Sequence, residues 1–228
     1  MDDPGDVIVV TGAASGMDRA CAHRFAGRAE LVLVDLDPDA VAAVAAATGG
    51  QPFAADVTDA ARVAELAAFV ASTGPLHALV HAAGISPVMA ERARILEVDL
   101  RGTALLLDAF DRLQRLDHSP LDDPALAYGW AKRAVVRLVR RAAPSWGARG
   151  ARIVSLSPGV IDTPMAAREE AVGPMIAQLM ETTPLHREGT ADELAAVVDF
   201  LCSTDASYIT GVDIVVDGGT TAGLASGV

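Results

Sequence analysis

A tyrosine and a lysine stand four residues apart in the segment "YGWAK", and this pair could carry out acid–base chemistry. Tyr128 and Lys132 are about one helical turn apart, and Lys132 is the only lysine in the chain. A phenol with its ordinary pKa of about 10 is a poor base at neutral pH. A neighbouring ammonium favours the phenolate, so we expect Lys132 to lower the Tyr128 pKa. The alternative is an amphipathic helix in which Tyr128 faces the core and Lys132 faces solvent.

A glycine-containing segment near the N-terminus could bind a dinucleotide. In "VIVVTGAASGMDRA", Gly12 and Gly16 lie between a strand-like run and a helix-like run. Glycines at such a turn let a pyrophosphate approach the backbone N–H groups of the helix N-terminus. Asp35 ends the next strand-like run, where a carboxylate can hydrogen-bond an adenosine ribose diol and would repel a 2′-phosphate. We therefore expect NAD rather than NADP. The alternative for Asp35 is a turn residue at the end of a strand.

The segments that must position these residues alternate between strand-like and helix-like patterns. Near-continuous valine, isoleucine and leucine are typical of strands buried on both faces of a parallel sheet, and we expect strands at 7–12, 31–35, 52–56, 77–84, 151–159 and 212–219. Apolar residues at helical spacing predict helices at 17–27, 37–47, 58–72, 89–116, 125–146 and 191–203. This alternation predicts an α/β fold with a doubly wound parallel sheet, a Rossmann-type arrangement of three α/β/α layers.

One segment interrupts this alternation. Residues 164–188 contain several methionines and have a proline near each end. An excursion after the carboxyl end of a strand favours a substrate lid, and an ordinary pair of surface helices is the alternative. The chain has no internal repeat or linker, so we expect residues 1–228 to form a single nucleotide-binding domain.

Composition limits the classes of partner. The formal net charge of −12 and a pI near 4.7 argue against a nucleic-acid partner and against docking on an anionic membrane surface. The acidic start "MDDPGD" is unlike a signal peptide, and no apolar run reaches the roughly 18 residues of a membrane span. We expect a soluble cytoplasmic protein that acts on a small molecule. Cys21 and Cys202 lack metal-type spacing and are expected to be reduced thiols, with no metal site.

The chain resembles the short-chain dehydrogenase/reductase family from about residue 6 to 220. The elements that carry the resemblance are "TGAASGM", "VDLD", "DVTD", "HAAG", "YGWAK", "SLSPGVIDTPM" and "ASYITGVDIVVDGG", in this order and spacing. The pattern around "AYGWAKRAVV" is most similar to bacterial 3α-hydroxysteroid dehydrogenase-like members. The resemblance implies an NAD(P)-dependent interconversion of an alcohol and a ketone. It also implies a homodimer or homotetramer.

The resemblance assigns roles to positions of this chain. The catalytic positions would be Tyr128 as acid–base group, Lys132 as its partner and as ribose anchor, and Asp99 as their support. The cofactor-binding positions would be Gly12, Ala14, Ser15, Gly16, Met17, Asp35, Leu36, Asp56, Val57, Ala82, Ala83, Gly84, Tyr128, Lys132, Pro158, Gly159, Ile161 and Thr163.

Three residues depart from the family pattern. Asp18 replaces the third glycine of the loop, and a carboxylate near a pyrophosphate is expected to weaken cofactor binding. His81 stands where the family usually has asparagine, a position that tethers strands and that a histidine could still serve. Asp99 replaces the asparagine of the catalytic tetrad, where its charge could pair with the Lys132 ammonium. The spacing of His77 and His81 is metal-like, but both lie on an expected strand without a carboxylate cluster.

The largest departure precedes Tyr128. The family has a buried strand there that ends in a catalytic serine, which polarises the substrate oxygen. Here the expected helix at 89–116 runs into "DRLQRLDHSPLDDPALAY", which contains no β-branched residue, and Ser119 is its only serine. We expect one central strand to be lacking or lost. Either the sheet closes up around the gap, or residues have been lost at this point.

Two functions remain open at this stage. The first is an NAD-dependent oxidoreductase that interconverts a secondary alcohol and a ketone, with a hydroxysteroid or another bulky apolar molecule as a candidate substrate. The second is a catalytically silent member of the same family, acting as a nucleotide-binding or oligomer-scaffold protein. The missing serine, Asp18 and the missing strand favour the second.

Overall fold

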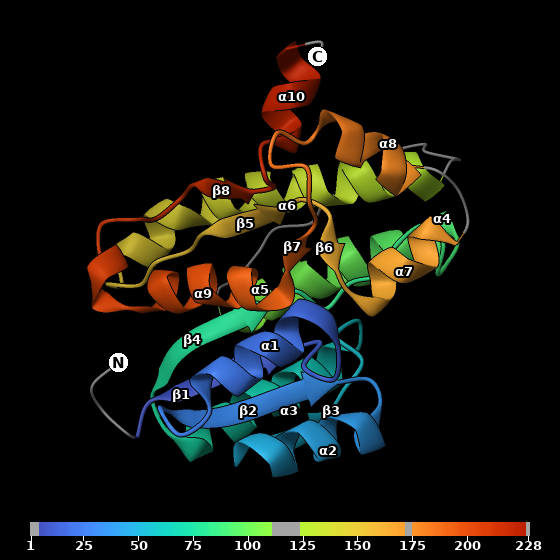
Figure 1. The fold of residues 1–228 in the computed structure, drawn as a ribbon. Coiled ribbons are helices and arrows are strands. Elements are labelled where there is room, and N and C mark those ends of the chain that lie inside the picture. The colour runs from blue at the N-terminus through green and yellow to red at the C-terminus, as the bar shows by residue number, and fades with distance from the viewer. Residues whose placement is uncertain (1–4, 111–123, 172–174, 227–228) are drawn as a thin grey trace.

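The N-terminal half of the protein is a parallel sheet with strand order β3-β2-β1-β4 (Figure 1). The structure is a computed structural model that describes residues 5–110, 124–171 and 175–226. The strands are β1 (Val7–Thr11), β2 (Glu30–Asp35), β3 (Gln51–Ala54) and β4 (Leu76–His81), connected by α1 (Gly16–Phe25), α2 (Pro38–Thr48) and α3 (Ala60–Thr73). This order confirms the predicted doubly wound arrangement, and each element begins within three residues of its expected position.

The strands at the centre of this sheet are apolar on both faces because helices cover both faces. In β1, Ile8 and Val10 pack with Phe25 of α1 and Val44 of α2 in one buried cluster. The alternate residues of the strand belong to a second cluster on the other face, which includes Leu66 of α3. Continuous valine and isoleucine in β1 therefore follow from its place in the middle of three layers.

The C-terminal half contains a shorter sheet that runs alongside two long helices. Strand β5 (Ser155–Pro158) pairs in parallel with β8 (Asp213–Val216). The helices are α6 (Pro124–Gly147) and α9 (Ala191–Cys202) (Figure 1). Short strands β6 (Ile161–Asp162) and β7 (Gly189–Thr190) pair with each other. A 3₁₀ turn, η2 (Thr204–Ala206), follows α9, and α10 (Thr220–Ser226) ends the described chain.

The two halves do not form one continuous sheet in the described part of the chain. Every residue of β1 is buried, whereas no residue of β4 or of β5 is. The second edge of β4 and the edge of β5 away from β8 have no strand partner among the described residues. The sheet has therefore not closed up around the predicted gap. We expected the loss between Phe110 and Ala127, and residues 111–123 of this segment lie outside the described residues.

The expected single helix at 89–116 was wrong. Its described part is divided into a short α4 (Arg92–Ile95), a π-helical turn η1 (Leu96–Gly102) and α5 (Thr103–Phe110). Apolar spacing could not reveal the change, because it reports only which side of a helix is buried. Gly102 ends the wide turn, and a Cβ at this glycine would lie 2.8 Å from the Val57 side chain. Long π-helical turns are rare and are frequent at functional sites.

Three expected strands were too long. The strand predicted at 77–84 ends at His81, the one at 151–159 is reduced to β5, and the one at 212–219 is reduced to β8. The residues beyond these strands are the loop "AAG" after β4, Gly159 after β5 and the turn "DGG" after β8. By the family resemblance, "AAG" and Gly159 belong to the cofactor site.

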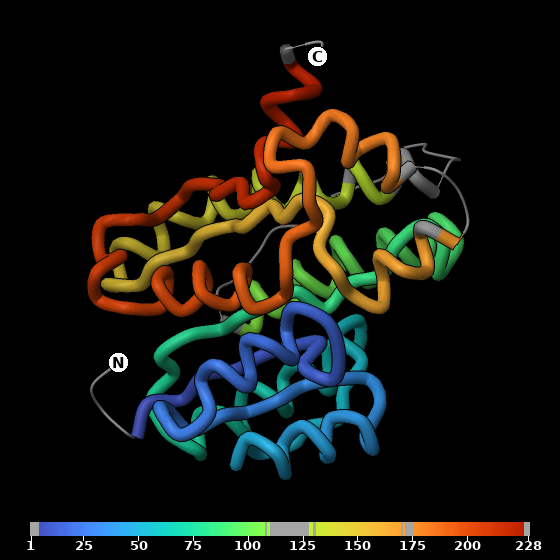
Figure 2. Tube along the Cα trace, in the orientation of Figure 1, coloured from blue at the N-terminus to red at the C-terminus, as the bar shows by residue number. Residues whose placement is uncertain are grey.

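Residues 164–188 leave the sheet as predicted, and they form helices α7 (Pro164–Glu170) and α8 (Met175–Thr182). Figure 2 traces this segment in orange between β6 and β7. Thr163 caps α7, since its hydroxyl accepts a hydrogen bond from the Ala166 N–H at 3.2 Å. Whether the segment acts as a lid stays a prediction.

Neither cysteine forms a disulfide bond. Cys21 and Cys202 are free, and burial raises the pKa of the Cys21 thiol to about 12.

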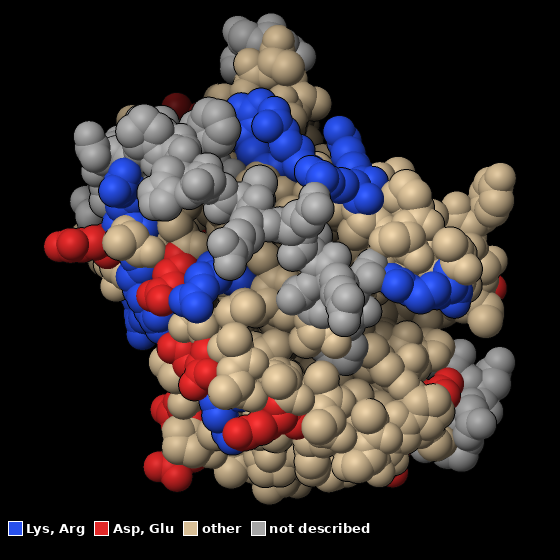
Figure 3. Space-filling view, turned by 180° about the vertical axis from the view of Figure 1, so that it is seen from behind, with Lys and Arg blue, Asp and Glu red and all other residues tan. Residues whose placement is uncertain are grey.

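Charged side chains are unevenly distributed on the surface. On the face opposite to that of Figure 1, basic side chains gather in the upper half and acidic ones lie on the flank below them (Figure 3). No helix within the described residues is long and apolar enough to cross a membrane.

Arg152 connects the strand side of the C-terminal half to the end of α9. Its guanidinium donates to the carbonyl oxygens of Leu201 at 2.8 Å, Ser203 at 3.3 Å and Ile209 at 3.4 Å. We expect Arg152→Met to lower the free energy of unfolding by about 2 kcal/mol, because it leaves these carbonyls without their charged donor. Urea unfolding would measure the loss. The exposed Arg168 of α7 is the control, and an equal effect of Arg168→Met would contradict the assignment.

Candidate active site

Tyr128 and Lys132 lie one turn apart on α6. The Lys132 Nζ atom is 5.2 Å from the centroid of the Tyr128 ring. The Lys132 side chain is 44% exposed, and Tyr128 is partly buried. The two groups therefore lie on the same side of the helix. This contact does not fit the alternative in which they face opposite sides.

Asp99 joins this pair from the π-helical turn. Its side chain is fully buried, and its Oδ2 atom lies 3.0 Å from Lys132 Nζ. The other oxygen, Oδ1, accepts a hydrogen bond from the Ile85 N–H at 2.9 Å. A Cβ at Gly84 would lie 3.1 Å from Lys132 Nζ and 3.2 Å from Asp99 Oδ1, so the loop after β4 closes over the ion pair. The structure thus brings together three predicted catalytic positions.

The protonation states of the pair differ in part from expectation. Burial raises the pKa of Tyr128, Lys132 lowers it, and Asp99 and Glu169 raise it again, with a net rise. The predicted fall toward neutrality was therefore wrong for the protein without ligands, because burial outweighs the ammonium. For Lys132, burial lowers the pKa but Asp99 and Tyr128 raise it more, so the net direction is upward. At neutral pH Lys132 is therefore a cation and Tyr128 is a protonated phenol.

The glycine loop has the conformation that a pyrophosphate site needs. Gly12 and Gly16 have φ values of +75° and +56°, which favour glycine. Helices α2 and α3 have side-chain caps from Asp37 and Asp59. In contrast, Ser15 at the start of α1 makes no capping hydrogen bond with its side chain. Because the Ser15 side chain does not cap the helix, the start of α1 fits an anionic pyrophosphate.

Asp35 combines the expected position with a structural role. Its Oδ2 atom accepts from the Ala14 N–H at 3.0 Å, and its Oδ1 atom accepts from the Asp37 N–H at 3.2 Å. The carboxylate thus holds the glycine loop against the end of β2. A carboxylate has further acceptor positions on each oxygen, so it can still receive the hydroxyls of a ribose. Leu36, next to it, is 65% exposed and could cover one side of an adenine.

Asp56, one of the expected cofactor-binding positions, is paired with a cation that the sequence analysis did not identify. Asp56 Oδ2 accepts from Arg94 at 2.8 Å, and Asp56 Oδ1 binds the Thr58 hydroxyl at 2.7 Å. Burial raises the pKa of Asp56, but Arg94 and Thr58 lower it more. Arg94 also contacts Glu97 at 3.0 Å. No spacing signal connects Arg94 to Asp56, because the two lie 38 positions apart and meet only in the fold.

Asp18 points into the protein rather than away from it. It is only 7% exposed, and a Cβ at Gly12 would lie 2.8 Å from its Oδ2 atom. Burial and the neighbouring Asp35 raise the pKa of Asp18 well above its ordinary value, against a lowering effect of Lys132. A carboxyl group therefore occupies the space between α1 and the loop after β1, where the family pattern has only a glycine.

Some of the remaining cofactor positions lie against the glycine loop, and the others lie at strand ends and helix starts. Ala83 lies against Gly12, where a Cβ would be 3.2 Å from its backbone, and Thr163 lies against Gly16 at 3.8 Å. Pro158 ends β5, Gly159 follows it, and Ile161 begins β6; Met17 is in the first turn of α1, and Ala82 and Val57 lie in loops after β4 and β3.

His77 and His81 have different partners. His77 Nε2 lies 2.8 Å from the Cys202 carbonyl oxygen, and its Nδ1 atom lies 3.3 Å from Asp6. His81 lies between two threonine hydroxyls, Thr11 and Thr103, at 2.7 and 2.9 Å. The described residues contain no cluster of three or more potential metal ligands. His81 thus performs the strand-tethering role that the sequence allowed.

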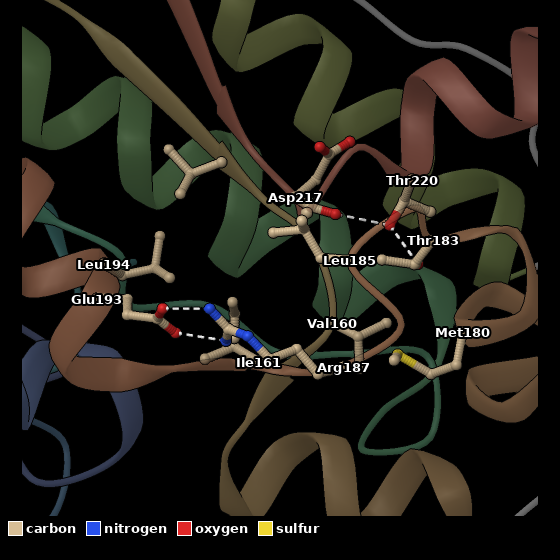
Figure 4. A pocket seen from close by; sticks show the side chains of 13 residues that line it. Val160, Ile161, Met180, Thr183, Leu185, Arg187, Glu193, Leu194, Asp217 and Thr220 are labelled. Atoms are coloured by element: carbon tan, nitrogen blue, oxygen red, sulfur yellow. Dashed lines mark hydrogen bonds and ion pairs between the residues drawn. The ribbon is translucent and has the colours of Figure 1, made fainter.

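A small pocket lies beneath the 164–188 segment (Figure 4). It encloses about 100 Å³, and Val160, Ile161, Met180 and Leu185 form apolar parts of its wall. Its polar groups are already paired with one another: Arg187 binds Glu193, and the Thr183 and Thr220 hydroxyls lie 2.7 Å apart. In this form the pocket holds a small group rather than a large ligand.

No described serine stands where the family has its catalytic one, and Ser119 lies outside the described residues. The structure does reveal one unforeseen polar cluster. Ser155 and Ser157 of β5 both donate to Asp213 of β8, at 2.7 and 2.9 Å. Alternate residues of β5 share one face, and Asp213 faces Ser155 in the strand register, so the "SLS" pattern was the available signal.

Comparisons with known proteins agree with this geometry. A family model described as "Enoyl-(Acyl carrier protein) reductase" matches residues 12–113 and 118–221. The chain is 34% identical to D-threitol dehydrogenase of Mycolicibacterium smegmatis, over 95% of this chain and 93% of that protein. It is 33% identical to the short-chain type dehydrogenase/reductase y4vI of Sinorhizobium fredii, over 96% of this chain but only 45% of that longer protein.

Solved structures give the same result. The crystal structure of levodione reductase superimposes with a TM-score of 0.81 at 30% identity, covering 96% of this chain and 98% of that one. These relatives do not specifically support the expected similarity to 3α-hydroxysteroid dehydrogenase-like members. The family model covers most of the chain, and the matched residues include the glycine loop, Tyr128 and Lys132. The chain belongs to the short-chain dehydrogenase/reductase family, whose members are oxidoreductases that use a nicotinamide cofactor to act on alcohols and ketones.

Proposed function

We propose that this protein is an NAD-dependent oxidoreductase that interconverts a secondary alcohol and a ketone, with Tyr128 as its acid–base group. The observation that carries the proposal is the alignment of Tyr128, Lys132 and Asp99, which meet at 5.2 and 3.0 Å beside the glycine loop. A buried carboxylate that holds an ammonium against a phenol has no evident purpose in a purely structural helix. It suits a site that must move one proton.

The residues of the chain would divide the work in the following way. When bound, the nicotinamide ring supplies or accepts the hydride. Tyr128, a protonated phenol at neutral pH, donates its proton to the carbonyl oxygen of a ketone in the reductive direction. Lys132 stabilises the phenolate that remains, and Asp99 keeps Lys132 in place and charged. In the oxidative direction Tyr128 must first lose its proton, and its raised pKa makes this direction favour alkaline pH.

NAD is the preferred cofactor in this proposal. Asp35 lies at the end of β2, where its Oδ2 atom binds the Ala14 N–H of the glycine loop and its charge would oppose a 2′-phosphate.

The substrate we propose is a small secondary alcohol. D-threitol dehydrogenase and levodione reductase are relatives with small substrates in their names. A hydroxysteroid or another bulky apolar molecule is the alternative substrate class. A panel that contains D-threitol, levodione and a 3α-hydroxysteroid separates these substrate classes.

A catalytically silent family member remains the second candidate. Asp18 in the phosphate loop and the lack of a described serine at the substrate oxygen favour it. Calorimetric titration with NAD and NADH assays on the panel distinguish the two. NAD binding without turnover would support the silent form, and no binding at millimolar NAD would contradict both.

Tyr128→Phe is expected to lower turnover by about a hundredfold or more, because it removes the proton donor without changing the ring. The NAD dissociation constant should change little, and the rise of oxidation rate with pH should disappear. Tyr208→Phe is the matched control, since Tyr208 is the other tyrosine and is fully exposed. Equal activity of the two variants would rule out the role of Tyr128.

Asp35→Asn is expected to shift cofactor preference toward NADP by about tenfold, because it removes the charge that opposes a 2′-phosphate. The amide oxygen can still accept the Ala14 N–H, which should keep the shape of the glycine loop, and only the exposed Asp37 N–H loses its acceptor. The ratio of kcat/KM for NAD and NADP measures the effect. Asp39→Asn, an exposed acid in the first turn of α2, serves as the control, and an unchanged ratio in Asp35→Asn would refute the assignment.

Asp18 should make NAD binding depend on pH. Its pKa is raised by burial and by Asp35, so its carboxyl group loses its proton only well above pH 4 and then repels the pyrophosphate. We expect the NAD affinity of the wild type to fall by about tenfold as the pH rises and Asp18 loses its proton. Lys132 should stay charged over the same pH change. Asp18→Asn should remove this fall. Calorimetry at several pH values is the measurement, and parallel curves for the two proteins would contradict the repulsion.

A further inference from the structure

The π-helical turn that carries Asp99 is hydrogen-bonded by Thr103, which is linked through His81 to Thr11. The Thr103 N–H bonds to the Leu100 carbonyl oxygen, whereas a regular α-helix would direct it to Asp99. The Thr103 hydroxyl instead donates to the Asp99 carbonyl oxygen at 2.7 Å. Thr103 is 6% exposed, so this bond is shielded from water.

The hydrogen bonds of Thr103 fix the tautomer of His81. A threonine hydroxyl has one proton to donate, and that proton points to the Asp99 carbonyl. Toward His81 Nε2, 2.9 Å away, Thr103 must therefore accept, and Nε2 must carry the ring proton. The other ring nitrogen, Nδ1, is then an acceptor, and it receives the Thr11 hydroxyl at 2.7 Å. One neutral imidazole thus satisfies both threonines.

His81 has reason to remain neutral. Burial and the positive charge of Lys132 both lower its pKa. A second proton would turn Nδ1 into a donor and break the bond from Thr11. The two carboxyl groups of this region, Asp99 and Asp18, both interact with Lys132, so they do not offer His81 a counter-charge.

We propose that His81 is a positioning residue for the catalytic pair, and this rests on the function proposed above. As the Nε2–H tautomer, it connects the ends of β1 and β4, which face each other at Thr11 and His81 in the strand register, to Thr103. Thr103 fixes the π-helical turn, and the turn fixes the Asp99 carboxylate that holds Lys132 beside Tyr128. The sheet therefore sets the position of the ammonium through His81.

Thr103→Val tests the link, because valine keeps the shape and lacks the hydroxyl. Thr48→Val is the matched control: Thr48 is 8% exposed and its hydroxyl donates to the Val44 carbonyl four residues earlier at 2.9 Å, far from the site. We expect both variants to lose similar thermal stability. Only Thr103→Val should lower kcat by about tenfold or more and displace the pH dependence of kcat, with an NAD dissociation constant within about twofold of wild type.

His81→Asn and His81→Gln provide the second variants, in case Thr103→Val does not fold. Both should displace the pH dependence of kcat as Thr103→Val does. The same kcat and pH profile in Thr103→Val, Thr48→Val and wild type would overturn the proposal.

A measurement without substrate separates this proposal from the proposed function. In a nitrogen–proton correlation spectrum of protein labelled at histidine, the signals lost in His81→Asn belong to His81. They should report the Nε2–H tautomer from about pH 5 to pH 9. An Nδ1–H tautomer, or titration within this range, would overturn the proposal even in an active enzyme. The expected tautomer in a protein without turnover would support the relay and leave only the catalytic assignment refuted.

Discussion

The contact between the buried Asp99 carboxylate and the Lys132 ammonium is the interaction on which the site depends. Its partners come from different parts of the chain, η1 and α6, and the loop after β4 closes over it. A fully buried carboxylate is costly unless it is paired and hydrogen-bonded, and here it has both an ion-pair partner and the Ile85 N–H. The pairing therefore ties the N-terminal sheet to the helix that carries Tyr128.

The same pairing shapes the charge of the crevice. Asp18 and Asp99 both interact with Lys132, Asp99 in direct contact, and Asp35 in turn acts on Asp18. A pyrophosphate would add further negative charge. The N-terminus of α1, which lacks a side-chain cap, is then the main source of positive potential for that group. An acidic loop can still bind a dinucleotide if Asp18 retains its proton, as its burial favours.

Much of this structure could be predicted because the signals are local. The runs "VIVV" and "LVLV" predicted β1 and β2, and the four-residue spacing of Tyr128 and Lys132 predicted their contact. The π-helical turn, the Arg94–Asp56 pair and the raised pKa of Tyr128 could not be predicted. Each depends on residues that are distant in sequence and meet only in the fold, or on the balance between burial and charge. The lack of a β-branched run before Tyr128 was visible in the sequence, but the incomplete burial of the described strands β4 and β5 was not.

The strand that the family has before its catalytic tyrosine bears on only one part of the proposed function, the binding of the substrate oxygen. The glycine loop, Asp35, Asp99 and Lys132 are supported by β1, β2, β4, η1 and α6, none of which depends on a strand between β4 and β5 for its described contacts. What the family strand would add is a hydroxyl that polarises the substrate oxygen, a contribution separate from cofactor binding. Because Tyr128 is itself a protonated donor, it can supply one hydrogen bond to that oxygen. In the proposed function, the constraint on activity therefore lies in how well a substrate is held beside Tyr128, since Tyr128, Lys132 and Asp99 already lie together.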